Sequence, residues 1–227
     1  MREFIKTEAA KLREMNFTDK RQYIWEYYKL HIIAGVVVLI IIGGLINTWF
    51  INPPKRDYLY IVWQAGHMPS EVFDGIAERL SPIIEDVDRY QITVRSYVLT
   101  GDPQMDQGLI MRLQALLSIG DVHIAIMDRQ ELESSILRGI IRPVDDLISE
   151  ASESNPVLAE LLYDRMEFFK IQYDDDTIAN EAMAINLQDA PLLTELYIIT
   201  EDLYLGLMVT STRVSETLKA LAVIFDV

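Results

Sequence analysis

The stretch "LHIIAGVVVLIIIGGLINTWF", residues 30–50, decides how this chain is organised. It holds 21 residues with no acidic or basic side chain apart from His31 at its edge, and a bilayer core needs about 20 apolar residues in a helix. A cleaved export signal has a shorter apolar region and a cleavage site of small residues, which residues 47–50 do not supply. A buried core helix would not explain the aromatic residues at both ends, 23–28 and 49–50. We therefore expect a retained transmembrane helix over residues 30–50.

Basic residues predict the orientation of that helix. Residues 1–29 carry seven Lys and Arg, whereas only Lys55 and Arg56 follow the helix closely. Cytoplasmic flanks are enriched in Lys and Arg. We expect a cytoplasmic amphipathic stub (1–29), a Pro-rich spacer (51–56) and an extracytoplasmic domain (57–227). The predicted location is the cell membrane, with a single pass, a cytoplasmic N-terminus and the lipid bilayer as a partner of residues 30–50.

The predicted extracytoplasmic domain is strongly acidic. Residues 57–227 contain 11 basic and 30 acidic residues, a net charge of −19, within a whole-chain charge of −15. Such a domain repels phosphate backbones, which argues against nucleic acid as a partner. The chain has no cysteine, so disulfides, thiolate metal sites and cysteine nucleophiles are excluded. A solvated acidic exterior explains the charge without any ligand, although basic partners are favoured.

After the spacer, the spacing of apolar residues alternates between that of a strand and that of a helix, which predicts strands and helices in turn. Strands are expected at 58–64, 90–99 and 121–128. Helices are expected at 72–87 with a kink at Pro82, from Asp102 to Gly120 with a buried stripe that includes Ile110, and at 129–138. The order β-α-β-α-β-α predicts a parallel sheet covered by helices.

The second half of the domain reads less regularly. We expect a polar loop at 149–155, a helix from Asn155 to about Arg165, two strands around a polar turn within 167–187, a helical turn at 191–197, a strand at 203–211 and a last helix from Val214. Antiparallel strands are expected after residue 167. The predicted fold class is α/β, a three-layer domain with a mainly parallel, mixed sheet.

Three stretches carry a resemblance to known proteins. "GDVHIAIMDRQELESSILRGIIRPVDDLI" (120–148) and "LYLGLMVTSTRVSETLKALAVIF" (203–225) resemble segments of bacterial extracytoplasmic solute-binding proteins, and "KRQYIWEYYKLHII" (20–33) resembles the start of single-span membrane proteins of Firmicutes-type bacteria. The resemblance implies a shortened domain similar to one lobe of a periplasmic-binding-protein-like fold. A complete solute-binding protein has two larger lobes and a hinge.

Ligands of open α/β sheets lie beyond the carboxyl ends of the strands. This rule singles out residues that follow the first, third and late predicted strands: Gln64, Gly66, His67, Asp128, Arg129, Thr210 and Ser211. The last two match the Thr-Ser turn of the resembled family. The alternative is that these residues are turn residues and helix caps, with Asp128 capping the next helix.

Other polar groups fit structural roles better than chemical ones. Residues 174–176, three successive Asp, lack the spacing of a Ca²⁺ loop and suit a hairpin turn. His67 and His123 are too far apart in sequence to predict a zinc site. No nucleophile, phosphate-binding or dinucleotide motif is present, so neither a catalytic residue nor a cofactor is predicted.

Together these features predict a membrane-tethered, extracytoplasmic binding module that recognises a small solute, a peptide or an envelope component. A transporter or another membrane protein is a candidate partner. The alternative is a structural or interaction subunit of a bacterial membrane-associated assembly. An extracytoplasmic hydrolase is the third choice, because a catalytic triad is recognised in space rather than in sequence.

Overall fold

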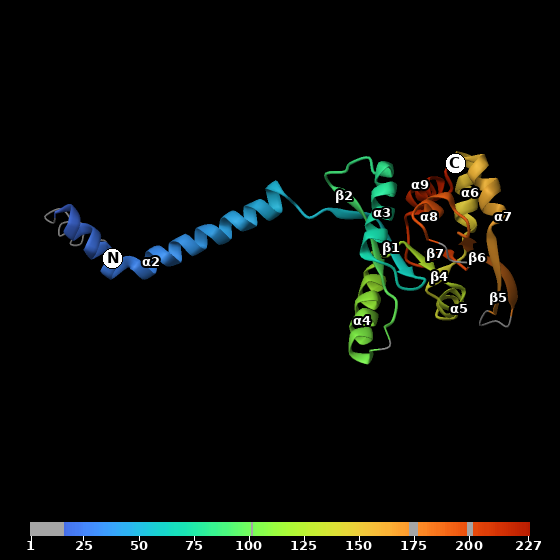
Figure 1. Cartoon of the computed structure of the whole chain (residues 1–227), viewed down its shortest axis with the longest axis horizontal. Coiled ribbons are helices and arrows are strands. Elements are labelled where there is room, and N and C mark those ends of the chain that lie inside the picture. The colour runs from blue at the N-terminus through green and yellow to red at the C-terminus, as the bar shows by residue number, and fades with distance from the viewer. Residues whose placement is uncertain (1–15, 101, 173–176, 199–201) are drawn as a thin grey trace. The chain divides into compact units, whose positions relative to one another are not determined.

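The computed structural model describes residues 16–100, 102–172, 177–198 and 202–227 (Figure 1). The chain divides into two compact units, which meet between Pro54 and Lys55. This division falls inside the predicted spacer. The three successive Asp at 174–176 and most of the predicted stub lie outside the described residues.

The first unit is one long helix. α2 (Phe17–Ile46) continues into a π-helical segment, η1 (Asn47–Ile51). The Asn16 side chain caps it by accepting the N–H of Asp19 at 2.9 Å, because an Asn oxygen reaches the third helical N–H well.

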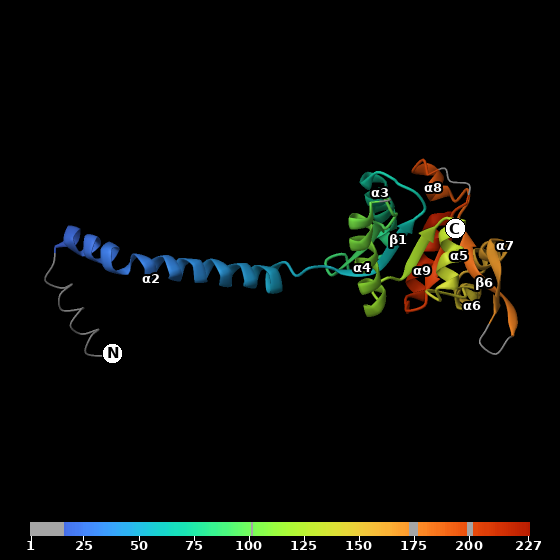
Figure 2. The ribbon, with the colours of Figure 1, turned by 90° about the horizontal axis from the view of Figure 1, so that it is seen from below.

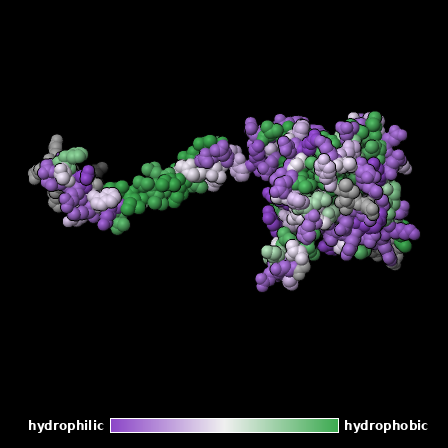
Figure 3. All heavy atoms as spheres, in the orientation of Figure 1, coloured by the Kyte–Doolittle hydropathy of each residue, from purple (hydrophilic) through white to green (hydrophobic). Residues whose placement is uncertain are grey.

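One segment of this helix, Trp25–Ile51, is long and apolar enough to cross a membrane, and none of it is buried against the described chain. Figure 3 shows it as a continuous hydrophobic band. The segment is therefore not a core helix of the described part of the protein.

The second unit is built on one mixed sheet, seven-stranded over the described residues, with the order β2-β1-β3-β7-β6-β5 and β4 beside β7. Its strands are β1 (Arg56–Gln64), β2 (Tyr90–Ser96), β3 (Ile124–Met127), β4 (Ile141–Arg142), β5 (Met166–Gln172), β6 (Ile178–Asn186) and β7 (Tyr204–Met208). β1 is parallel to β2 and to β3, and the other pairs are antiparallel.

The expected antiparallel strands after residue 167 are confirmed, but the expectation of a mainly parallel sheet is wrong. β5 and β6 are joined by a short connection, which suits only an antiparallel pair. β7 also runs against β3. Gly206 lets β4 approach β7, because a Cβ there would meet the Ile141 side chain at 2.9 Å.

Helices cover both faces of the sheet (Figures 1 and 2). One layer holds α3 (Ser70–Leu80), α6 (Asp145–Ser154), α7 (Pro156–Asp164), α8 (Pro191–Glu195) and α9 (Val214–Phe225); the other holds α4 (Pro103–Ile119) and α5 (Arg129–Leu137). β1 shows how the sequence divides them. Leu59, Ile61 and Trp63 enter the first core, whereas Tyr60 and Val62 enter the second, because alternate side chains of a strand point to opposite faces.

Trp63 anchors the first core. It is fully buried, its ring lies 5.8 Å from that of Phe73, and its indole N–H lies 3.2 Å from the carbonyl oxygens of both Ala65 and Gly66. Burying a large apolar side chain contributes about 1.5–3 kcal/mol. The second unit contains both apolar cores, so it has the interior of an independent domain.

Three helix boundaries differ from the prediction. The sequence predicts Thr18 as the cap of the helix that enters the membrane and Ser70 as the cap of the next one, but Asn16 caps α2, and Ser70 is the first residue of α3. α3 also ends at Leu80, before a 3₁₀ turn, η2 (Ser81–Ile83), that contains Pro82. The expected kinked helix to residue 87 is therefore wrong, since proline disfavours the helical conformation of the residue before it.

The predicted polar loop at 149–155 is instead the second half of α6. Leu147 and Ala151, one turn apart, are buried. The hydroxyls of Ser149, Ser152 and Ser154 donate to the carbonyl oxygens four residues earlier, so these serines find partners within the helix. The packing of these two apolar residues therefore overrides the polar composition.

Candidate functional site

A cleft of about 540 Å³ lies on the sheet face that α4 and α5 cover. Gln64 ends β1 and Asp128 follows β3, so the cleft lies at the carboxyl end of the parallel strands. Its volume falls within the usual range of small-molecule sites. The described residues that line it are Gln64, Tyr97, Val98, Leu99, Leu109, Ile110, Leu113, Gln114, Leu117, Asp128, Gln130, Glu131, Arg138 and Ile140.

α4 forms the apolar wall of the cleft. The Asp102 side chain caps this helix by accepting the N–H of Gln104 at 2.9 Å, and Gly120 ends it with a positive φ of 76°, as the sequence predicts. The predicted buried stripe is only half-buried, and Ile110 is 44% exposed. No residue of α4 is fully buried, because the cleft separates part of the helix from the sheet.

The opposite side of the cleft is polar and belongs to the start of α5. Asp128 caps α5 by accepting the N–H of Glu131 at 2.9 Å. The Glu131 carboxylate accepts the Gln64 amide at 3.3 Å and the Arg138 guanidinium. Arg138 also donates from Nε to the carbonyl of Ser134 at 3.2 Å. The lining charges are therefore Asp128 and Glu131 against Arg138, and the last two neutralise each other.

Two tyrosines lie beneath the cleft. The hydroxyl oxygens of Tyr60 and Tyr97 are 3.0 Å apart, and both side chains are buried. Burial, and then the hydrogen bond with Tyr97, raise the pKa of Tyr60 well above its ordinary value. The Tyr60 hydroxyl therefore stays protonated at neutral pH. Since one O–H donates to the other oxygen, one hydroxyl hydrogen has no acceptor among the described residues.

The structure brings together two of the predicted site residues in this cleft, Gln64 and Asp128. Gly66 and His67 lie in the turn that leads to α3 and do not line it. Arg129 turns away from it: its guanidinium donates to the hydroxyl of Tyr204 at 2.8 Å and to Glu167 at 3.3 Å. It also lies over the Tyr204 ring, so it joins α5 to the sheet.

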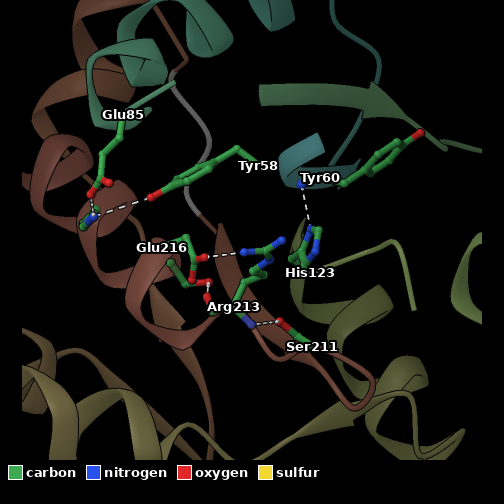
Figure 4. Close-up of polar contacts among 9 residues, drawn as sticks. Tyr58, Tyr60, Glu85, His123, Ser211, Arg213 and Glu216 are labelled. Atoms are coloured by element: carbon green, nitrogen blue, oxygen red, sulfur yellow. Dashed lines mark hydrogen bonds and ion pairs between the residues drawn. The ribbon is translucent and has the colours of Figure 1, made fainter. Parts of the chain in front are cut away.

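Thr210 and Ser211 lie at the opposite edge of the sheet, because β7 runs antiparallel to β3. The Met208 N–H donates to the carbonyl of His123, which precedes β3. Figure 4 shows Ser211 near Arg213 and His123, and its hydroxyl accepts the N–H of Arg213 at 3.4 Å. The expectation that both residues share an edge with Gln64 is wrong.

His123 is the central residue of this second cluster. Its Nδ1 accepts the backbone N–H of Tyr60 at 2.8 Å (Figure 4), so the neutral ring carries its proton on Nε2. Burial first, and then the positive charge of Arg213, lower the pKa of His123. Arg213 is paired with Glu216 at 2.6 Å. None of the residues of this cluster lines the cleft.

Sequence reasoning missed Glu131, Arg138, Tyr97 and Gln114. The sequence spacing of Glu131 and Arg138 could have pointed to them. Asp128 and Glu131 have the spacing of a capping box, in which the first residue bonds the N–H of the second. Arg138 lies seven residues after Glu131, about two helical turns, and so on the same side of α5. Tyr97 directly follows β2, and its N–H donates to the carbonyl of Trp63, so the pairing of β2 with β1 places it; the predicted strand ran on to residue 99 and hid this position. Gln114 gave no such signal, since only the packing of α4 brings it to the cleft.

Among the described residues, no group of three or more His, Asp or Glu side chains is placed to hold a metal ion. No protein family model, curated protein or solved structure significantly matches this chain. The resemblance to solute-binding proteins is therefore not confirmed and enters only the proposal below.

Proposed function

We propose that this protein is a membrane-tethered binding module whose second unit takes a small solute, a peptide or an envelope component into the cleft between α4 and α5. The observation that carries the proposal is the position of the cleft at the carboxyl end of β1 and β3. Ligands of open α/β sheets bind at this place. The expected resemblance to a solute-binding lobe agrees with it.

The lining favours binding over catalysis. Among the described lining residues, the polar groups are three glutamines, Tyr97, Asp128, Glu131 and Arg138. Glu131 and Arg138 hold each other, and Asp128 holds a helix end. No histidine, serine or lysine belongs to this set, so the described cleft offers no activated nucleophile. Apolar walls with a few oriented polar groups suit reversible recognition.

The apolar helix supplies the tether in this proposal. Segment Trp25–Ile51 is long and apolar enough to cross a bilayer, and none of it is buried against the described chain. The excess of basic residues before it supports a cytoplasmic N-terminus with the acidic unit outside. Binding then takes place at the outer membrane surface, beside a transporter or another membrane protein.

A second function is favoured by the outer face of α4. Met105, Met111 and Ile119 are 65%, 62% and 67% exposed, more apolar surface than a solvated helix usually shows. A structural or interaction subunit would use this face to dock on another membrane protein. In that case a partner co-purifies, and no small compound stabilises the second unit.

A thermal screen with a cleft-filling variant tests the binding proposal. The fragment 55–227 is heated with solutes, short peptides and envelope sugars, and unfolding is followed by circular dichroism. A ligand at about 100 times its Kd stabilises by about 2.7 kcal/mol, a rise of roughly 5–10 °C for a domain of this size. Gln114→Trp places a large ring at the exposed cleft rim and should abolish the rise.

Ser118→Trp is the matched control. It adds the same ring to the same helix at an exposed position outside the cleft lining, so it should keep the full shift. The proposal is refuted if no compound raises the melting temperature, or if a compound that does so acts equally on Gln114→Trp.

A further inference from the structure

We infer that the occupant of the cleft carries a protonated amine on a short aliphatic body. This inference rests on the proposed function and specifies its ligand. Two independent properties of the cleft lead to it: the chemistry of its wall and the balance of charge at its polar end.

The wall is aliphatic. Apart from Tyr97, the apolar lining residues are Val, Leu and Ile, and they come from α4, from the segment before it and from Ile140. Nucleobases stack on aromatic rings or guanidinium planes. The described lining presents one tyrosine and one guanidinium, that of Arg138, which is already paired with Glu131. Flexible aliphatic groups fill such a wall well, because each buried CH₂ contributes about 0.8 kcal/mol to transfer from water. The volume of about 540 Å³ leaves room for a body of several carbons.

The polar end has a negative charge in excess. Arg138 is the one cation among the described lining residues, and Glu131 neutralises it. Asp128 accepts one helix N–H, and its second carboxylate oxygen has no partner among the described residues. The N-terminus of α5 offsets about half a charge, so it does not cancel Asp128 and cannot hold an anion beside it.

The net charge of the whole domain also favours a cationic ligand. Residues 57–227 carry a net charge of −19, which attracts cations and repels carboxylates and phosphates over several ångströms of solution. A protonated amine at Asp128 gains a charge-assisted hydrogen bond. A carboxylate at the same place would face Asp128, and the described lining holds no cation besides Arg138, which Glu131 already pairs.

Two sources supply this chemistry: a free alkylamine, or the amino terminus of a peptide that begins with an aliphatic residue. The peptide would also present a carbonyl oxygen to the donors of the cleft, among them the spare hydroxyl hydrogen of the Tyr60–Tyr97 pair. Hexylamine represents the first source and leucinamide the second.

The test compares hexylamine, hexanol and hexanoate at about pH 7 on ¹⁵N-labelled fragment 55–227, with leucinamide and N-acetyl-leucinamide as the second series. Shifts of the side-chain amides of Gln64 and Gln114 report binding. Hexylamine should bind at least tenfold more tightly than hexanol, and hexanoate more weakly than either. The full chain in lipid nanodiscs should give the same order with leucinamide and its acetylated form.

Asp128→Asn removes the charge and keeps a good helix cap, so it should weaken hexylamine about tenfold or more and leave hexanol unchanged. Glu133→Gln removes an equal charge from an exposed position of α5 outside the lining and should change neither. The amine inference is overturned if hexanol or hexanoate binds as tightly as hexylamine or more tightly, or if Asp128→Asn binds hexylamine as tightly as the native protein does. Either result leaves the proposal of a binding cleft intact. Failure of all five compounds at millimolar concentration also overturns the amine, whereas the binding cleft itself is decided by the thermal screen with Gln114→Trp.

Discussion

His123 is a buried imidazole that serves as a hydrogen-bond acceptor within the sheet. Its Nδ1 takes the N–H of Tyr60, a backbone group of a central strand. Its pKa is lowered because burial and then Arg213 disfavour the charged ring, although Asp57, Glu216 and Asp121 oppose this. Protonation would place a hydrogen on the acceptor nitrogen. The native state therefore binds fewer protons than the unfolded chain below the ordinary pKa of about 6.5.

The free energy of unfolding should fall as the pH drops from about 7 to about 5. The loss should approach, at most, about 1.4 kcal/mol per pH unit. His123→Asn keeps an acceptor oxygen near the Nδ1 position and cannot titrate, so its stability should change less over this interval. Denaturant unfolding of both proteins at each pH measures the difference. Parallel pH profiles would contradict the role assigned to His123.

Among single residues, those fixed by local chemistry were predictable. Asp102 and Asp128 cap helices as the sequence indicated. Thr210 and Ser211 were placed at the wrong edge, because the direction of β7 depends on the long path of the chain through β4, β5 and β6. No local pattern encodes that direction. Glu131 could have been found from its capping-box spacing. Tyr97 was overlooked because the predicted strand ran to residue 99, past the end of β2 at Ser96.

α4 and α9 are opposite cases of helix packing. α9 buries six residues, among them Leu221 and Ile224, and lies against α3, α6 and α8. α4 has a sound cap and a glycine end but buries no residue fully. Since tertiary packing supplies most helix stability, α4 should be the more weakly held of the two.

Hydrogen exchange should show this difference directly. The amide hydrogens in the middle of α4 should exchange at least about tenfold faster than those of α9, because local opening exposes little additional apolar surface. A ligand that fills the cleft should slow amide hydrogen exchange in α4 and leave the exchange in α9 unchanged. Mass spectrometry of peptides from 103–119 and 214–225 gives both rates. Equal protection of the two helices would show that α4 is held by more than its visible contacts.

The elements themselves followed largely from hydrophobic periodicity. β1, β2, α4, α5 and α9 lie close to their predicted positions. α6 was missed because its serines and glutamates resemble a loop, while only Leu147 and Ala151 carry its packing. β4, with two residues, is too short for any period to reveal. Its pairing depends on Gly206 across the sheet.

The chain as a whole combines an apolar helix with an acidic domain that has its own cores. The face of the second unit that Figure 3 shows is mostly hydrophilic. Residues 55–227 should therefore behave as soluble protein, while the full chain should remain with membranes. This expectation depends on the exposed apolar side chains of α2 and not on any contact between the units.

Membrane retention should be lost when charges enter the middle of α2. Val38→Arg with Ile41→Arg costs about 5–7 kcal/mol of insertion, so this protein should leave membranes in alkaline carbonate. Val38→Leu with Ile41→Leu should stay in the pellet. In protoplasts that express the native chain, added protease should digest residues 55–227. If that region resisted the added protease, the domain would lie on the cytoplasmic side, opposite to the proposed orientation.

The position of Trp63 gives the domain a built-in optical reporter. Trp25 and Trp49 belong to the apolar helix, so among the three tryptophans of the chain only Trp63 remains in residues 55–227. It lies next to Gln64 but on the opposite face of the sheet from the cleft. Its fluorescence should therefore record unfolding of the main core as a red shift, undisturbed by direct quenching from whatever occupies the cleft.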